Sequence, residues 1–267
     1  MSRGVDNVDA VVGLKRLKSG SVDLTVTSPP YDSLRDYDSD VPPWSGDVWR
    51  SVLSELFRVS ALGGVVVWIV SDKSIDGSES GTSFRQALYA KDLGFRLHDT
   101  MIWRKDGFSE AGSLQTRYGQ VFEYMFVLSK GKPKTFNPIK DRRNLKSGKV
   151  TVTKRKADGS MVKCQGANIG TYGVRFNVWD QASVKSNTSE GHRAPFPLRL
   201  AVDHVRTWSN KGDTVLDPFL GSGTTGVACR QLERDFIGFE ISRRFYEMAV
   251  ARIERSTAQA NFNFMTK

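Results

Sequence analysis

Short apolar runs alternate with amphipathic segments along most of the chain. Residues 22–27 and 65–72 are apolar and rich in β-branched side chains, the pattern of strands buried on both faces of a parallel sheet. Residues 47–61 instead place apolar side chains at helical spacing, and Gly63 and Gly64 follow as a stop signal. This alternation predicts an α/β fold with a doubly wound, mostly parallel sheet.

The same rhythm continues towards the C-terminus, with one interruption. We expect a helix over 83–93, strands over 96–103 and 120–128, a helix over 197–208, a strand over 214–217, a helix over 224–234, a strand over 236–240 and a helix over 243–255. The tail after 255 is expected to be frayed or loosely packed. Between 130 and about 180 the chain is basic and Gly-rich instead, and "VTVT" at 150–153 predicts short β-hairpins.

Positive charge is concentrated in the interrupting segment. Lys130 to Lys163 contains twelve Lys or Arg and two acids, Asp141 and Asp158, so this stretch carries the entire +10 net charge of the 267-residue chain. A single basic insert in an otherwise balanced protein is what a phosphate-binding surface requires. We therefore expect nucleic acid as a partner, rather than a merely solvated loop.

Composition excludes several other classes. The longest apolar run, residues 62–70, is too short to span a bilayer, and the N-terminus has no apolar segment of the kind that directs export. Cys164 and Cys229 stand alone and the three histidines are scattered, so neither a disulfide framework nor a metal site is expected. These features predict a cytoplasmic protein without a membrane anchor.

Two adjacent prolines follow the first predicted strand in "TSPPY" (27–31). Pro29 and Pro30 have no N–H to donate and fix the backbone, while Ser28 is pushed into an extended conformation. The result is a stiff corner that presents a hydroxyl, bare carbonyl oxygens and the ring of Tyr31. Taken alone, this segment fits a proline-rich turn with a core tyrosine equally well.

A glycine motif lies between a predicted strand and a predicted helix. Gly221, Gly223 and Gly226 have the GxGxxG spacing, and Glu240 ends the next strand, where an acid binds ribose hydroxyls in dinucleotide folds. A nicotinamide fold usually starts with this unit, whereas only about fifty residues follow it here. Asp217, just before the glycines, is placed to accept a hydrogen bond from a ligand ammonium. S-adenosylmethionine, with an amino acid end and a nucleoside end, would use all of these groups.

Together, "TSPPY" (27–31) and "DPFLGSGTT" (217–225), in this order around a basic insert, resemble the DNA amino-methyltransferases of the β arrangement. The resemblance implies a Rossmann-like methyltransferase sheet, S-adenosylmethionine as cofactor and double-stranded DNA as substrate. It also implies a division into a catalytic half (1–130), a target-recognition insert (131–180) and a cofactor-binding half (181–267).

The resemblance assigns roles residue by residue. Ser28, Pro29, Pro30 and Tyr31 would form the catalytic corner: Ser28 Oγ and the Pro29 carbonyl accept the N–H bonds of the target amine, and Tyr31 stacks on a flipped base. The residues implied in cofactor binding are Asp9, His192, Pro197, Asp217, Phe219, Gly221, Ser222, Gly223, Thr224 and Glu240. The cations expected to contact DNA are Lys140, Arg142, Arg143, Lys154, Arg155 and Lys156. Trp103 and Glu123 match family positions too, but core packing or strand pairing accounts for both.

Several alternatives stay open at this point. The serine of SPPY favours cytosine N4 as the target over adenine N6, whose enzymes more often carry aspartate there. A nicotinamide-dependent oxidoreductase would explain the glycines but not the corner or the insert, and a non-catalytic DNA-binding protein would explain the insert alone. An enzyme acting on RNA or on protein glutamine is a closer rival, although the concentrated charge argues against a protein substrate. The recognition sequence, the choice between monomer and homodimer, and a cognate restriction endonuclease as partner are not determined by the sequence.

Overall fold

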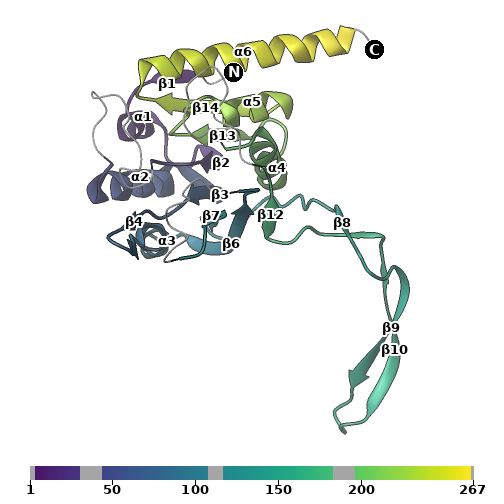
Figure 1. Cartoon of the computed structure of the whole chain (residues 1–267). Coiled ribbons are helices and arrows are strands. Elements are labelled where there is room, and N and C mark those ends of the chain that lie inside the picture. Colours follow the sequence, from purple (N-terminus) through teal and green to yellow (C-terminus); the bar gives the residue numbers. More distant parts are fainter. Residues whose placement is uncertain (1–3, 31–43, 108–116, 183–195, 266–267) are drawn as a thin grey trace. The chain divides into compact units, whose positions relative to one another are not determined.

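A computed structural model describes residues 4–30, 44–107, 117–182 and 196–265, with the backbone alone over 257–265 (Figure 1). Its largest element is an eight-stranded sheet in the order β1-β14-β13-β2-β3-β7-β6-β12. The strands are β1 (Val5–Asn7), β2 (Val22–Thr27), β3 (Ser60–Val70), β6 (Arg96–Arg104), β7 (Phe122–Ser129), β12 (Val178–Asp180), β13 (Thr214–Asp217) and β14 (Asp235–Glu240). Only β7 runs antiparallel to its neighbours in this sheet. The predicted doubly wound, mostly parallel sheet is confirmed.

Six helices among the described residues pack in two groups. They are α1 (Ala10–Arg16), α2 (Gly46–Val59), α3 (Thr82–Asp92), α4 (Leu198–Trp208), α5 (Thr224–Gln231) and α6 (Arg243–Met265). Helix α2 contacts α1 and α3, and α5 contacts α4 and α6. None of these helices is long and apolar enough to cross a membrane. The small hairpin of β4 (Ser74–Ile75) and β5 (Ser78–Glu79) precedes α3.

Several predicted boundaries are wrong; for example, β3 begins at Ser60 instead of 65 and α5 ends at Gln231 instead of 234. Helix α2 ends at Val59, before the glycines, because Ser60 turns into the extended conformation and starts β3 while its hydroxyl caps the Leu56 carbonyl at 2.7 Å. Gly63 lies within β3 instead of stopping the helix. Its φ of 78° favours glycine, and a Cβ at this position would lie 2.9 Å from the Lys134 Cβ. The expected frayed tail is helical, since α6 continues to Met265.

Gly13 lets helix α1 pack closely against strand β14. A Cβ built on Gly13 would lie 2.7 Å from two ring atoms of Phe239, which is 2% exposed. The Val8 N–H also donates to the Glu240 carbonyl at 3.0 Å. Close packing at Gly13 therefore places Asp9, the residue that begins α1, beside the end of β14.

Residues 138–176 form a second compact unit. It contains β8 (Arg142–Arg143) paired with β11 (Tyr172–Gly173), and β9 (Gly148–Arg155) paired antiparallel with β10 (Met161–Ile169). The tip of the second hairpin is closed by a bond from the Lys156 N–H to the Ser160 carbonyl at 2.8 Å. The hairpin predicted around 150–153 is confirmed.

Substituting Gly13→Val should destabilise the protein by about 1–3 kcal/mol, the usual cost of overpacking a tight core. The reason is the rigid Phe239 ring that the new side chain would meet. Gly4→Val is the matched control, because nothing lies within 4 Å of a Cβ at that position. Urea unfolding of the two variants measures the difference, and equal stabilities would contradict the packing described.

Candidate active site

Strands β2 and β13 lie side by side although about 190 residues separate them. They pair in parallel, with Leu24 opposite Val215 and Thr25 opposite Leu216. The carboxyl ends of parallel neighbours meet at one edge of the sheet, and in open α/β sheets ligands bind at this edge where the chain order reverses. The segment Ser28–Pro30 follows β2 and the glycine motif follows β13, so the fold brings the two sequence motifs together.

A buried carboxylate joins the two motifs. Thr27 Oγ1 donates to Asp217 Oδ1 at 2.6 Å, and Thr225 Oγ1 donates to Oδ2 at 2.7 Å. The Phe219 N–H adds a third bond, to Oδ1 at 3.1 Å. Asp217 is 1% exposed, and burial raises its pKa to about 6 against the opposing effect of these hydrogen bonds. The described bonds of Asp217 therefore connect the end of β2 to the start of α5.

The glycines shape the loop between β13 and α5. Gly221 and Gly223 have φ of 52° and 81°, the left-handed region that favours glycine. A Cβ on Gly223 would also lie 3.1 Å from the Ala249 Cα in α6. The third glycine serves packing, because a Cβ on Gly226 would lie 2.4 Å from Ile253 Cδ1. The first two glycines thus leave a turn without side chains in front of α5, and the third lets α5 approach α6.

Glu240 holds this loop from the end of β14. Its Oε2 accepts a bond from the Gly221 N–H at 2.8 Å, and its Oε1 accepts one from the Ser242 N–H at 2.9 Å. Burial raises the pKa of Glu240, and the two N–H donors partly oppose that shift. Each carboxylate oxygen has a further lone pair for a ligand hydroxyl.

Asp9 lies next to Glu240 along the same edge, because β1 pairs with β14 up to Asn7 opposite Glu240. Asp9 is the N-cap of α1, and its Oδ1 accepts bonds from the Val11 and Val12 N–H groups at 2.9 and 3.1 Å. The structure therefore gathers Asp9, Glu240, Gly221 and Asp217 at one edge of the sheet.

Arg252 supports the glycine loop from α6, which sequence reasoning missed. Its Nη1 donates to the Ser222 carbonyl at 3.1 Å, to Ser222 Oγ at 2.9 Å and to Thr224 Oγ1 at 3.1 Å. Ser222 and Thr224 are both buried. Thr27 and Thr225 were also missed, although both lie inside the quoted motifs. Their position next to a predicted site residue is a usable signal, whereas no local pattern marks Arg252.

The catalytic corner is described as far as Pro30. Ser28 and Pro30 are half-buried and Pro29 is buried, in irregular backbone directly after β2. Tyr31 and His192 lie outside the described residues. Pro197, expected near the cofactor, is the buried N-cap of α4 with φ −61° and ψ 140°.

Phe219 packs against two tryptophans, Trp44 just before α2 and Trp68 in β3. Its ring makes edge-on contacts with Trp44 and Trp68, at centroid distances of 5.3 and 6.4 Å. Farther along the edge, Trp103 is buried and its Nε1 donates to the Gln181 carbonyl at 2.9 Å. It pairs in register with Glu123, which is buried and forms an ion pair with Lys105. These contacts agree with the packing and pairing roles expected for Trp103 and Glu123.

The cations expected to contact DNA lie in the unit of residues 138–176. Lys140, Arg143, Lys154, Arg155 and Lys156 are exposed. Arg142 is half-buried instead: its Nε donates to the Val174 carbonyl at 3.0 Å, and its guanidinium lies 4.3 Å from the centre of the Phe176 ring. Arg142 therefore helps to hold its own unit together.

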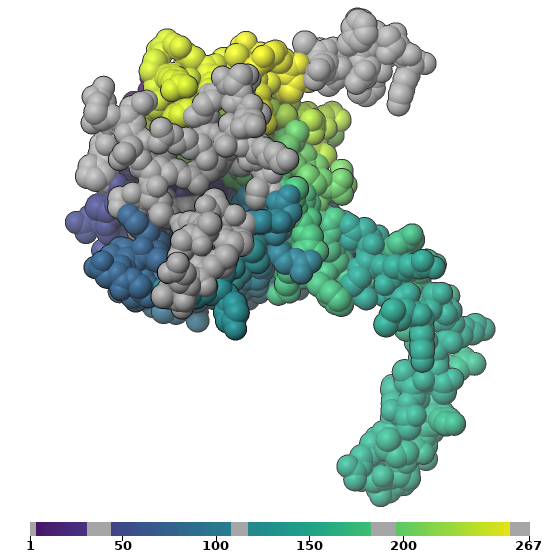
Figure 2. All heavy atoms as spheres, in the orientation of Figure 1, coloured from purple at the N-terminus to yellow at the C-terminus, as the bar shows by residue number. Residues whose placement is uncertain are grey.

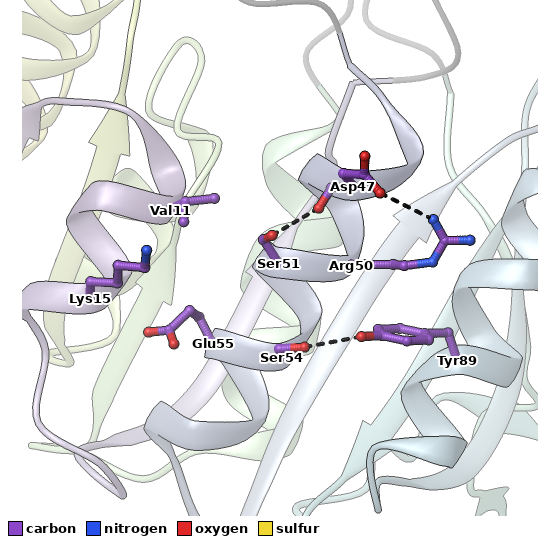
Figure 3. Close-up of a pocket in the computed structure, with 8 residues that line it drawn as sticks. All are labelled: Val11, Lys15, Asp47, Arg50, Ser51, Ser54, Glu55 and Tyr89. Atoms are coloured by element: carbon purple, nitrogen blue, oxygen red, sulfur yellow. Dashed lines mark hydrogen bonds and ion pairs between the residues drawn. The ribbon is translucent and has the colours of Figure 1, made fainter.

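A hollow lies away from these residues, between α1, α2 and α3 (Figure 3). It is open and lined by polar groups such as Ser54 and Tyr89, whose hydroxyl oxygens are 3.2 Å apart. No residue assigned to the cofactor or the target base lines it.

Among the described residues, no group of three or more His, Cys, Asp or Glu side chains is arranged to hold a metal ion. Cys229 is fully buried, and burial raises its pKa, so this thiol is not a nucleophile.

Known proteins resemble this chain over most of its length. The family model described as "DNA methylase" matches residues 22–251. The orphan methyltransferase M.BamHII of Bacillus amyloliquefaciens is 48% identical over 243 residues, which cover 88% of this chain and 89% of that protein. The DNA adenine methyltransferase YhdJ of Escherichia coli is 29% identical, covering 92% and 81%.

Solved structures agree on the fold. A DNA modification methylase from Thermus thermophilus, TTHA0409, superposes with a TM-score of 0.63 at 26% identity and 96% coverage of both chains. The cytosine-N4-specific PvuII DNA methyltransferase superposes with a TM-score of 0.68 at 17% identity, covering 98% of this chain and 92% of its own. With the family model spanning both motifs, the chain belongs to the S-adenosylmethionine-dependent N6/N4 DNA methyltransferases.

Proposed function

We propose that this protein is a site-specific DNA methyltransferase that modifies the exocyclic amine of a flipped base, with cytosine N4 as the target. The observation that carries the proposal is the bonding of Asp217 to both Thr27 and Thr225. It joins a corner suited to accept an amine and a loop suited to hold a cofactor. A packing turn or a nicotinamide site would account for the loop alone.

The glycine loop fits S-adenosylmethionine. Gly221 and Gly223 leave the turn before α5 without side chains, so a ligand can approach the backbone closely. Glu240 at the end of β14 would accept ribose hydroxyls, and Asp9 beside it would accept the adenine amine. The cofactor supplies an electrophilic methyl group on a sulfonium centre.

The corner after β2 activates the target amine by accepting its hydrogen bonds. An amine conjugated to a ring is a poor nucleophile, because its lone pair is delocalised. Ser28 Oγ and the Pro29 carbonyl would accept the two N–H bonds and favour a pyramidal nitrogen whose lone pair is free. Prolines suit this position, since neither offers a competing N–H donor. Positioning is then the main catalytic contribution.

Asp217 acts as a positioning residue in this proposal. Its oxygens accept hydrogen bonds from Thr27, Phe219 and Thr225, which fix the carboxylate between the corner and the loop. The direct ligand contact expected from the sequence stays a prediction. Thr27 directly precedes Ser28, and Thr225 lies in the first turn of α5. Fixing these hydroxyls to one carboxylate sets the distance between the corner and the loop.

Adenine N6 is the second candidate for the target, because the YhdJ relative is a DNA adenine methyltransferase. The serine at position 28 favours cytosine. Methyltransferases among the relatives include type II enzymes and one called an orphan, so the proposed partner is double-stranded DNA, and no nuclease is part of the proposal.

DNA incubated with the protein and S-adenosylmethionine should contain N4-methylcytosine when its nucleosides are analysed by mass spectrometry. Ser28→Ala should lower the rate by about 10- to 100-fold, as expected for one lost hydrogen bond to the reacting group. Ser51→Ala, which removes an exposed hydroxyl on α2, should leave the rate unchanged. Appearance of N6-methyladenine would overturn the choice of base, and no methylated nucleoside would overturn the function.

Calorimetry should detect S-adenosylmethionine binding and no NADH binding. Glu240→Ala should weaken cofactor binding by about 10-fold or more, because it removes the proposed ribose contact and leaves the Gly221 and Ser242 N–H groups without their acceptor. Glu247→Ala, an exposed acid in the first turns of α6, is the control. Tight NADH binding without S-adenosylmethionine binding would favour an oxidoreductase instead.

The raised pKa of Asp217 predicts a pH-dependent stability. Its folded-state pKa of about 6 exceeds the 3.8 of an unperturbed aspartate. The folded state therefore binds the proton more tightly, and the free energy of unfolding falls as the pH rises from about 4 to about 6. By linkage the loss is on the order of 3 kcal/mol. Asp217→Asn cannot titrate at this position. In denaturant unfolding, the free energy of unfolding of the variant should therefore rise relative to that of the wild type between about pH 4 and about pH 6.

Asp47→Asn, which removes an exposed acid from α2, supplies the comparison for losing a surface carboxylate. A difference between Asp217→Asn and wild type that is constant from pH 4 to pH 7 would contradict the raised pKa. Because the carboxylate positions the site, Asp217→Asn should also lower the rate of methyl transfer while S-adenosylmethionine still binds.

A further inference from the structure

The β9–β10 hairpin has two chemically different faces. Residues directly opposite each other in an antiparallel pair lie on the same face, and neighbours along a strand alternate. Opposite pairs are Arg155 with Met161, Thr153 with Lys163, Thr151 with Gln165 and Lys149 with Asn168. These eight residues form one face, named the polar face here. The other, the valine face, contains Val150, Val152, Lys154, Val162 and Cys164.

Burial follows this division in part. All eight residues of the polar face are exposed, whereas on the valine face Val150, Val162 and Cys164 are half-buried and Val152 and Lys154 are exposed. A Cβ on Gly166 would lie 2.9 Å from Val152 Cγ1 and 3.0 Å from Val150 Cγ2. The two valines therefore close over this glycine, and the valine face has its own small apolar cluster.

A register shift adds Asn168 to the polar face. Between the pairs Thr151–Gln165 and Lys149–Asn168, β10 has one more residue than β9. Without that bulge, simple alternation from Gln165 would place Asn168 on the valine face. The irregularity thus gathers another amide on the polar face.

Positive charge is also concentrated on the polar face. Of the four cations on the two strands, Lys149, Arg155 and Lys163 lie on the polar face and Lys154 on the other. In Figure 2 the atoms of residues 138–176, in teal, form an elongated arm. The major groove of DNA admits a two-stranded ribbon of this kind.

We propose that the polar face of β9–β10 reads the target sequence in the major groove of double-stranded DNA. Thr151, Thr153, Gln165 and Asn168 carry donors and acceptors that match base edges, with amides suited to adenine and hydroxyls to any base. Lys149, Arg155 and Lys163 contact phosphates or guanine. Lys154, assigned to DNA contact from the sequence, is outside the reading set because it lies on the valine face. This inference rests on the proposed DNA methyltransferase function.

Methylation of random-sequence DNA by the full-length protein, followed by long-read sequencing, first gives the wild-type target. Gln165→Ala should then relax the preference at one position of that target, lowering discrimination by about 10- to 100-fold. Its neighbour Cys164→Ala, on the valine face, should leave the preference unchanged. Circular dichroism and S-adenosylmethionine binding check that both variants keep the fold.

A second pair of variants separates the effect of charge on affinity from the reading of bases. If Lys163 contacts a phosphate, Lys163→Ala should weaken binding to cognate and unrelated duplexes in similar proportion. The slope of log affinity against log salt concentration should then fall by about one. If Lys163 contacts guanine, the preference at one target position should relax instead. Lys154→Ala should leave the target sequence unchanged.

The two proposals fail in different ways. If the wild type methylates no DNA, both fall. If it methylates a defined site and Gln165→Ala preserves the preference at every position, or if Cys164→Ala or Lys154→Ala alters it, only the assignment of the polar face is overturned. Methylation of RNA alone would replace DNA as the partner and overturn both.

Discussion

The site depends on one buried carboxylate with partners from distant parts of the chain. Asp217 accepts hydrogen bonds from Thr27, at the end of β2, and from Thr225, in α5. Burial raises its pKa to about 6, so these bonds offset only part of the desolvation cost. A group that costs stability at neutral pH is more readily understood as serving the site than the fold, and perturbed carboxylates do cluster at functional sites. Thr27 belongs to one motif and Asp217 and Thr225 belong to the other, so this carboxylate ties the two motifs together.

The remaining contacts at this edge of the sheet extend the same principle. Glu240 holds the Gly221 N–H, and Arg252 holds the Ser222 carbonyl and hydroxyl from α6. The glycine loop is therefore fixed at both ends by side chains from other elements. Gly221 and Gly223 have no side chains of their own, so side chains from β14 and α6 hold the loop. A preorganised loop loses less entropy when a ligand binds.

Sequence patterns predicted the elements whose signal is local and strong. β2 (Val22–Thr27) and β13 (Thr214–Asp217) have the predicted bounds, and α3 begins one residue earlier than expected. The short β1 and α1 were missed, since three and seven residues carry too little periodicity. The antiparallel direction of β7 was not predicted either, because an apolar run reads the same in both directions.

Candidate site residues within motifs could be named from the sequence. Arg252 could not, because its partners lie 28 and 30 residues away and only the packing of α5 on α6 brings them together. The faces of the β9–β10 hairpin likewise depend on register, which the bulge before Asn168 changes.

The most direct test of the account is a crystal structure of the protein with S-adenosylmethionine bound. We predict that the ligand lies along residues 221–224, with its ribose at Glu240 and its sulfonium facing Ser28. Binding in the hollow between α1, α2 and α3, or along the loop with the sulfonium turned away from the end of β2, would contradict the claim that the corner and the glycine loop form one site.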